Sequence, residues 1–295
     1  MANRIVIFYG GRLKQQLIDI RNGGVDVGVD IQLVNYDSLG FDTKDKDKGL
    51  TIRSAIGLEE YKVVYFRNTK NYWEEVNLIL DSVVEDTIVI DPILIRGRST
   101  DVCKLHQMWL LDKNGLNVPR SIFGNLKYLR EYGVKKIGYP LILKGSKGDR
   151  RTQVFKLFND ESWLKGWDMF EYKERYENQR YMLQEYIEND RDYRVMVVGG
   201  KALGVMERAA GENPRLKNVF NKTELPEEVL EKAVEAARVC GIAIAGVDVV
   251  FKKGEKEPYF WEVNRAPNYS RFEEVTQISV AMETAKYLKS LISSV

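Results

Sequence analysis

Histidine and cysteine are scarce in this chain, and their scarcity excludes several kinds of enzyme. The 295 residues contain one histidine, His106, and two cysteines, Cys103 and Cys240. A zinc site built from several histidines is therefore excluded, and a serine–histidine–aspartate triad has little support. His106 falls within an expected helix, where we interpret it as a partly exposed polar residue. The cysteines lie far apart in helical contexts, which indicates free thiols in a reducing cytoplasm.

Long apolar runs and a strong net charge are also missing. No apolar run approaches the ~20 residues that a membrane-spanning helix requires. The first residues, Met-Ala-Asn-Arg-Ile-Val-Ile-Phe, resemble a core strand and lack the apolar region of a signal peptide. The formal charge of +2 favours neither a nucleic-acid partner nor a membrane surface. We therefore expect a cytoplasmic globular protein, with no nucleic-acid or membrane partner.

Strand and helix signals alternate through the first third of the chain, and they predict a parallel sheet flanked by helices. Continuous apolar runs at residues 5–9, 62–66 and 87–90 are typical of strands that are buried on both faces. The glycine pair after the first run lacks the Gly-x-Gly-x-x-Gly spacing of dinucleotide-binding dehydrogenases. We therefore expect an α/β region without that fingerprint.

Helices and strands are also predicted beyond residue 98. One helix begins near Ser99, and another extends from Pro226 to Cys240, where a glycine ends it. Strands are expected at residues 141–144 and 181–187. These signals divide the chain into modules 1–98, 99–180 and 181–295, with α+β character in the C-terminal part. The apolar positions of the first helix are Val102, Leu105, Met108 and Trp109.

The most informative stretch is a pair of predicted strands near the C-terminal end. Residues 245–251 and 259–264 are rich in Val, Phe, Tyr and Trp and flank a charged turn that contains glycine and proline. This pattern predicts a β-hairpin. Because side chains alternate along a strand, Trp261 and Val263 are expected on the face opposite to Glu262.

Three oxygen-bearing side chains are expected to converge on this hairpin. If Phe251 lies opposite Tyr259, Asp248 falls opposite Glu262, and Asn264 shares the face of Glu262. Two carboxylates and an amide suit Mg²⁺ better than Zn²⁺, which prefers nitrogen and sulfur. The alternative is an ordinary edge hairpin whose polar side chains face water.

The motifs of this hairpin resemble those of a known family. Ala-Gly-Val-Asp, ending at Asp248, and Glu-Val-Asn-Arg-Ala-Pro, beginning at Glu262, are similar to the metal-binding end of ATP-grasp ligases. The resemblance is greatest to the RimK-like branch, which holds the ribosomal protein S6 glutamate ligase and the lysine-biosynthesis amino-group-carrier ligases. It covers the whole chain and is most specific over residues 99–275. It implies an ATP-grasp fold: a Rossmann-like pre-ATP-grasp domain (1–98), a small subdomain (99–180) and a large subdomain with the metal site (181–295).

The resemblance implies that two lysines contact nucleotide phosphates. Lys104 lies before a proline at a spacing similar to that of the family, and Lys144 ends a strand and opens a glycine-containing loop. Such loops bind phosphate oxygens through backbone N–H groups. The loop departs from the family pattern because charged residues replace its later glycines. Its Arg150 and Arg151 either touch phosphate or an acidic substrate, or form a solvated loop tip.

The other nucleotide contacts follow from the same resemblance. Residues 184–187 correspond to the hinge whose backbone contacts adenine, since a backbone edge offers both donors and acceptors. Asp192-Tyr193-Arg194 resembles the family's Asp-x-Arg, with the aspartate near the ribose; the alternative is a surface ion pair between Asp192 and Arg194. The expected nucleotide-binding residues are Lys104, Lys144, Gln184, Glu185, Tyr186, Ile187, Asp192, Arg215, Lys217 and Asn218, and the expected catalytic residues are Arg208 and Lys144.

The chemistry that the resemblance implies is the activation of a carboxylate. ATP, with one or two Mg²⁺ and with Mn²⁺ as a substitute, would convert the carboxylate to an acyl phosphate. An amine on a small molecule, a peptide or a protein would then form the amide, with glutamate as an example of the added amino acid. Relatives imply a homo-oligomer. Two alternatives stay open: an ATP-binding protein with a regulatory role, and a small-molecule kinase. Arg265 and Arg271 either hold an acidic substrate or are surface charges.

Overall fold

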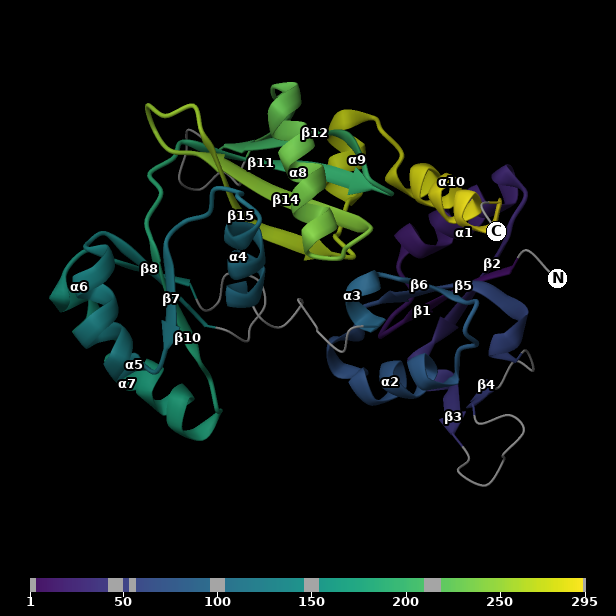
Figure 1. Cartoon of the computed structure of the whole chain (residues 1–295), viewed down its shortest axis with the longest axis horizontal. Helices are drawn as coiled ribbons and strands as arrows, with labels where there is room; N and C mark the ends of the chain where they lie inside the picture. Colours follow the sequence, from purple (N-terminus) through teal and green to yellow (C-terminus); the bar gives the residue numbers. More distant parts are fainter. Residues whose placement is uncertain are drawn as a thin grey trace.

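The computed structural model describes residues 4–41, 50–52, 57–95, 104–145, 154–209 and 219–293. Within these ranges three larger sheets carry the architecture (Figure 1). In Figure 1 the first sheet lies at the right, the second at the left, and the third above and between them. This mixture of parallel and antiparallel sheets agrees with the predicted α/β class with α+β character in the C-terminal part.

The first sheet is parallel, as predicted, and has the order β2-β1-β5-β6. Strand β1, one of its two central strands, is buried on both faces. Ile5 and Ile7 pack toward α1 and toward α10 (Val280–Ser293), whereas Val6 and Phe8 pack toward α2. The elements are β1 (Arg4–Tyr9), α1 (Gln15–Val27), β2 (Asp30–Asn35), η1 (Tyr36–Ser38), β3 (Leu39–Phe41), β4 (Leu50–Ile52), η2 (Leu58–Glu60), β5 (Tyr61–Arg67), η3 (Thr69–Asn71), α2 (Trp73–Ser82), β6 (Ile88–Ile90) and α3 (Pro92–Ile95).

The second sheet is antiparallel and has the order β7-β10-β8-β9. Helix α7 packs Trp163 and Phe170 onto it. Strand β10 follows the boundary predicted at residue 180, yet it pairs with β7 and β8 within this sheet. The elements are α4 (Lys104–Lys113), β7 (Ser121–Gly124), α5 (Leu126–Tyr128), the π-helical turn η4 (Leu129–Gly133), α6 (Val134–Ile137), β8 (Leu141–Gly145), β9 (Val154–Leu157), α7 (Asp160–Tyr176) and β10 (Tyr181–Glu185).

The third sheet is antiparallel and has the order β13-β12-β11-β14-β15. Its strands alternate between two cores: Val195 and Val197 pack toward α4 and α8, whereas Met196 and Val198 join the core shared with the first sheet. The elements are β11 (Arg191–Val198), β12 (Lys201–Ala209), β13 (Val219–Thr223), α8 (Glu227–Val239), β14 (Ile244–Phe251), β15 (Pro258–Arg265), α9 (Ser270–Thr276) and α10 (Val280–Ser293).

Helix α8 has the ends that the sequence predicts. Pro226 is its N-cap and Cys240 its C-cap, and Gly241 follows with a φ of 67°, which glycine adopts more readily than other residues. Among the described residues no helix is both long and apolar enough to cross a membrane.

Helix α4 forms as predicted, and of its predicted apolar positions Met108 is 3% exposed and Trp109 52% exposed. Its Gln107, which the pattern did not single out, is 4% exposed. The glutamine is buried because its side-chain amide donates to the carbonyl of Val263 (2.8 Å) and accepts from the N–H of the same residue (3.2 Å). These two hydrogen bonds fix α4 against β15. The expected start at Ser99 lies outside the described residues.

The hairpin β14–β15 has the predicted pairing at its functional end and a different pairing at its tip. Asp248 lies opposite Glu262, as predicted, but Phe251 pairs with Pro258 rather than with Tyr259. A register shift lies between the two regions, immediately after Asp248 along β14. One extra residue in β15 restores the pairing.

The extra residue is Trp261, and the bulge changes the face on which it lies. Phe260 and Val263 are both buried although they are three residues apart, as expected when two residues oppose one in a bulge. The prediction that Trp261 lies with Val263, opposite to Glu262, is therefore wrong. Trp261 lines the same cleft as Glu262.

Candidate active site

A cleft of about 1940 Å³ is lined by strands of the second and third sheets and by segments that follow strands of the first sheet. Its walls include β8 and β10, the face of the third sheet, and the loops that follow β1 and β5. The predicted Arg215, Lys217 and Asn218, like Arg150 and Arg151, lie outside the described residues. The predicted site residues that line the cleft are Lys104, Lys144, Gln184, Glu185, Tyr186, Ile187, Asp192, Arg208, Asp248, Glu262 and Asn264.

The three predicted metal ligands lie together in this cleft. Asp248, 5% exposed, pairs with Glu262 across the hairpin. The amide of Asn264 donates from Nδ2 to Asp248 Oδ2 (3.2 Å). The same amide also carries an oxygen, Oδ1, which can serve as a metal ligand while Nδ2 makes this hydrogen bond. A buried carboxylate beside a second carboxylate and an amide fits Mg²⁺, which prefers oxygen ligands.

Two arginines reach carboxylates on neighbouring strands. Arg194 on β11 binds Asp248 on β14 in a bidentate pair, with Nε–Oδ1 2.7 Å and Nη2–Oδ2 2.8 Å. The Asp248 carboxylate raises the pKa of Arg194 further above its usual value. Arg208 on β12 pairs with Asp192, with Nη2–Oδ1 2.6 Å. The alternative of an Asp192–Arg194 pair is therefore wrong, because the antiparallel register gives each residue a cross-strand partner.

The two predicted phosphate-binding lysines lie in different environments. Lys104 Nζ is 3.3 Å from Glu262 Oε1, and both side chains are 34% exposed. Lys144 Nζ donates to Gln184 Oε1 (2.6 Å) and lies 5.9 Å from the ring centre of Trp261. Burial and the charge of Lys104 lower the pKa of Lys144 to about 8. Lys144 is thus a largely buried cation with a neutral hydrogen-bond partner.

The predicted hinge connects the second and third sheets. Gln184 donates to Ser121 Oγ (2.9 Å), which fixes its side chain between that hydroxyl and the ammonium of Lys144. The N–H groups of Glu185 and Tyr186 donate to the carbonyls of Arg120 (2.9 Å) and Pro140 (3.2 Å). Burial raises the pKa of Glu185.

Several cleft residues were missed by sequence reasoning. Lys156 places its ammonium 4.7 Å from the ring centre of Tyr186. The loop after β1 also lines the cleft, and a Cβ at Gly10 would lie 2.2 Å from the ring of Tyr72. The glycine pair after the first strand was the available signal for this loop. An isolated lysine in a short strand carried none.

Arg265 and Arg271 both have partners within the protein, and Arg265 also lines the cleft. Arg265, 8% exposed, donates to the carbonyl of Phe66 (2.8 Å) and lies 3.7 Å from Asp91. It therefore connects β15 to the first sheet. Arg271 pairs with Glu274 (2.6 Å) on the surface. Arg271 is thus a surface charge, whereas Arg265 is a buried part of the cleft wall.

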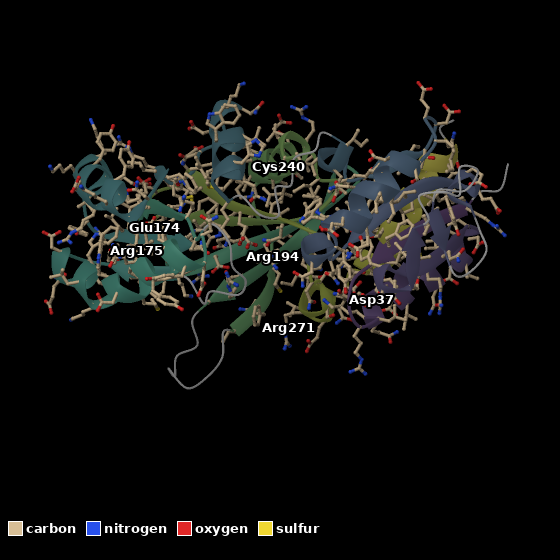
Figure 2. All side chains as sticks on the ribbon, turned by 90° about the horizontal axis from the view of Figure 1, so that it is seen from below. Asp37, Glu174, Arg175, Arg194, Cys240 and Arg271 are labelled. Atoms are coloured by element: carbon tan, nitrogen blue, oxygen red, sulfur yellow. The ribbon has the colours of Figure 1, made fainter. Side chains whose placement is uncertain are left out.

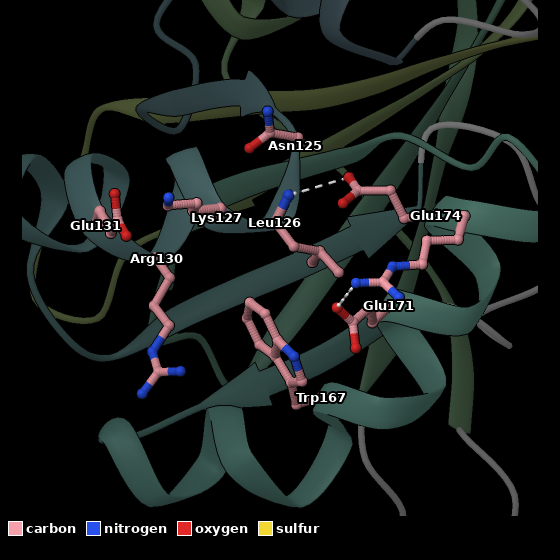
Figure 3. A pocket seen from close by; sticks show the side chains of 9 residues that line it. Asn125, Leu126, Lys127, Arg130, Glu131, Trp167, Glu171 and Glu174 are labelled. Carbon is pink, nitrogen blue, oxygen red and sulfur yellow. Dashed lines mark hydrogen bonds and ion pairs between the residues drawn. The ribbon is translucent and has the colours of Figure 1, made fainter.

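A smaller cavity, of about 650 Å³, lies between α5 and α7 (Figure 3). Trp167 projects into it, and Glu174 accepts from the N–H of Leu126 (3.0 Å). Glu171 pairs with Arg175 (2.8 Å) along α7. None of the predicted site residues lines this cavity. In Figure 2 its residues Glu174 and Arg175 lie toward one end of the molecule, and Arg194, which lines the larger cleft, lies near the centre.

Comparisons with known proteins show the family that the chain matches. Residues 101–288 match the family model of the RimK-like ATP-grasp domain. A probable alpha-L-glutamate ligase of Syntrophotalea carbinolica is 28% identical over 201 residues, covering 65% of this chain and 64% of the relative. The alpha-aminoadipate–LysW ligase LysX of Sulfurisphaera tokodaii is 25% identical over 230 residues, covering 76% and 79%. The chain thus spans just under two thirds of the length of the first of these relatives.

A solved structure confirms the ATP-grasp fold. The ATP-grasp ligase PsnB, complexed with a minimal precursor, Mg and ADP, superposes with a TM-score of 0.74. The superposition covers 97% of each chain at 16% sequence identity. At this identity the likeness concerns the fold alone.

Proposed function

The chain belongs to the RimK-like ATP-grasp family, and we propose that it is an ATP- and Mg²⁺-dependent carboxylate–amine ligase. One observation carries the proposal: a single cleft brings together two carboxylates and an amide on one hairpin with two lysines and two arginines. Oxygen ligands next to several cations are what a metal-bound triphosphate requires.

The nucleotide would lie between the hinge and the metal hairpin. Tyr186 and Ile187 would line the adenine pocket. The N–H groups of Glu185 and Tyr186 already donate to carbonyls of the protein, so the N–H of Ile187 would be the next backbone donor for adenine. Asp248, Glu262 and Asn264 would hold Mg²⁺, which supplies neutralisation of the charge on the phosphates when bound.

Cationic side chains would stabilise phosphoryl transfer. Lys104, Lys144 and Arg208 line the cleft and would neutralise the charge that spreads over the γ-phosphoryl group. A substrate carboxylate oxygen attacks the γ-phosphorus, and ADP leaves. An amine then attacks the carbonyl carbon of the acyl phosphate, loses a proton, and releases phosphate as the amide forms. Water must be excluded because it would hydrolyse the acyl phosphate.

The substrates are proposed from the relatives and from the shape of the cleft. The relatives are named as a glutamate ligase and a LysW ligase, and PsnB was solved with a precursor. We therefore favour an amino acid such as glutamate as one substrate and a small molecule, peptide or protein as the other. The cleft extends past the metal hairpin to the loops around Gly10 and Asn68, which leaves space for them. A homo-oligomer, a cytoplasmic location and the use of Mn²⁺ stay predictions.

Product analysis tests the proposal. The protein is incubated with ATP, Mg²⁺, the twenty amino acids and candidate peptide acceptors, and ADP, phosphate and new amides are measured. Acceptor-dependent release of ADP and phosphate together with an amide, absent in Asp248→Asn, supports ligation. A phosphorylated product without free phosphate identifies a kinase. Nucleotide binding without turnover across the screen indicates a regulatory role.

A further inference from the structure

Arg194 holds one of the two proposed metal-binding carboxylates at two points. Its Nε and Nη2 donate to Oδ1 and Oδ2 of Asp248 at 2.7 and 2.8 Å. A guanidinium that binds a carboxylate through two parallel hydrogen bonds fixes both the position and the plane of that carboxylate. The Asp248 side chain is 7% exposed and that of Arg194 24% exposed, so the pair is largely shielded from water.

A glycine makes room for this pair. Gly246 lies two residues before Asp248 on β14, so both positions face the same side of the sheet. A Cβ at Gly246 would lie 3.3 Å from Cδ and Nε of Arg194. Asn264 adds a third contact, since its Nδ2 donates to Asp248 Oδ2 (3.2 Å). A carboxylate has about four acceptor sites; within the described residues these hydrogen bonds take three of them, and Oδ1 retains one.

The other carboxylate is held differently. Within the described residues, the Glu262 carboxylate forms one ion pair, with Lys104 at 3.3 Å, between side chains that are each 34% exposed. Lysine is a flexible point charge and does not fix the plane of a carboxylate. The hairpin thus combines one rigid carboxylate with one that is free to adjust.

We propose that Arg194 is a positioning residue for the metal site: it fixes Asp248 so that one defined oxygen is presented to a divalent cation in the cleft. The inference rests on the proposed function, because it requires that Asp248 binds the metal of a metal–nucleotide complex. Residues that orient a metal-binding side chain typically change metal affinity about 10- to 100-fold when replaced. The competing role for Arg194 is direct contact with phosphate.

Arg194→Lys separates orientation from charge. Lysine keeps the positive charge beside the metal but loses the two-point contact. Mn²⁺ binding to the protein with saturating ADP is measured by electron paramagnetic resonance, and ADP binding in EDTA by calorimetry. We expect Arg194→Lys to weaken Mn²⁺ binding about 10-fold or more, with unchanged ADP binding in EDTA. Gly246→Ala adds a Cβ that would crowd Arg194 at 3.3 Å and Pro267 at 3.2 Å, and it should weaken Mn²⁺ binding in the same direction.

A matched control lies on the same strand. Arg191 pairs with Glu207 across β11 and β12 (2.9 Å), and neither residue lines the cleft; Arg191→Lys should bind Mn²⁺ and ADP as the unaltered protein does. Unaltered Mn²⁺ affinity in Arg194→Lys overturns the proposal. Weaker ADP binding in EDTA also overturns it and assigns Arg194 to phosphate. If Asp248→Asn binds Mn²⁺ normally, the proposed metal site itself fails, and Arg194 has no ligand to position.

Discussion

Replacing Lys144 with methionine should leave the fold equally stable or slightly more stable at pH 7, and less stable relative to the unaltered protein as the pH rises. Burial and the charge of Lys104 lower the pKa of Lys144 from 10.5 to about 8. This difference means that holding the charged lysine in the folded protein costs about 3 kcal/mol relative to the unfolded chain. Methionine fills a similar space without a charge and removes that cost.

The hydrogen bond from Lys144 to Gln184 (2.6 Å) offsets part of this gain. Hydrogen bonds that involve a charged group contribute about 1.5–3 kcal/mol, so at pH 7 the variant should range from equal stability to about 1.5 kcal/mol more stable. Below about pH 8 the lysine is protonated in both the folded and the unfolded protein, and its cost is fully present. Between about pH 8 and 10.5 the folded protein releases the proton first, so the stability of the unaltered protein rises with pH.

The assay is urea denaturation of both proteins from pH 7 to 10.5, with ADP affinity measured by calorimetry in parallel. The unaltered protein should gain up to about 3 kcal/mol relative to Lys144→Met across this range, and its ADP affinity should fall as the ammonium is lost. Lys156→Met is the matched control, because Lys156 is exposed on the neighbouring strand β9. A stability difference between Lys144→Met and the unaltered protein that does not change with pH would refute the reasoning.

Three further changes test other parts of the structure. Glu262→Gln should abolish ADP release while thermal denaturation stays unchanged; turnover at the normal rate would remove this residue from the metal site. Gln107→Leu should lower the free energy of unfolding by about 2–4 kcal/mol in urea, because the N–H and the carbonyl of Val263 both lose a buried partner, whereas a loss under 1 kcal/mol would contradict this. Burial raises the pKa of the Cys240 thiol to about 12. In a Cys103→Ser background, a thiol reagent at pH 8 should therefore react with Cys240 only after unfolding. Rapid labelling of the native protein would contradict the burial of this thiol.

Sequence patterns predicted the metal hairpin because its strands are regular where the polar residues lie. Asp248 and Glu262 face each other as expected. The assumed pairing of Phe251 with Tyr259 was wrong by one residue. The extra residue in the bulge, Trp261, shifts the register by one, so the predicted pairing of Asp248 with Glu262 is still found. Alternation assigns faces only while the period of two holds. A bulge depends on how the two strands pair, and no local residue pattern predicted its position at Trp261.

Helix α4 shows why a buried polar residue is hard to predict. Apolar periodicity located the helix through positions that include Trp109, which is exposed, and it gave no signal for Gln107, which is buried. The partner that satisfies the Gln107 amide lies 156 positions away in the sequence. A polar side chain is buried only where such a partner exists, so its burial is a property of the packing of α4 on β15.

The charge pairs show the same limit. Asp192 and Arg194 are two residues apart on one strand face, which suggested a pair between them. Their actual partners, Arg208 and Asp248, are 16 and 54 positions away. Antiparallel register places these partners directly opposite, where side chains lie closest across a sheet. Residue type therefore identified the charges, and only the register could pair them.

These pairs also explain why the lowered pKa occurs at Lys144. Among the cations that line the cleft, three have a carboxylate within hydrogen-bond or ion-pair distance on the third sheet: Lys104, Arg194 and Arg208. The partner of Lys144 is the neutral amide of Gln184, so its charge is less compensated than the charges of these three side chains. A buried charge without an opposite charge is costly, and an anion that enters the cleft removes that cost. A phosphate bound at Lys144 would thus supply the opposite charge that the other three side chains already have.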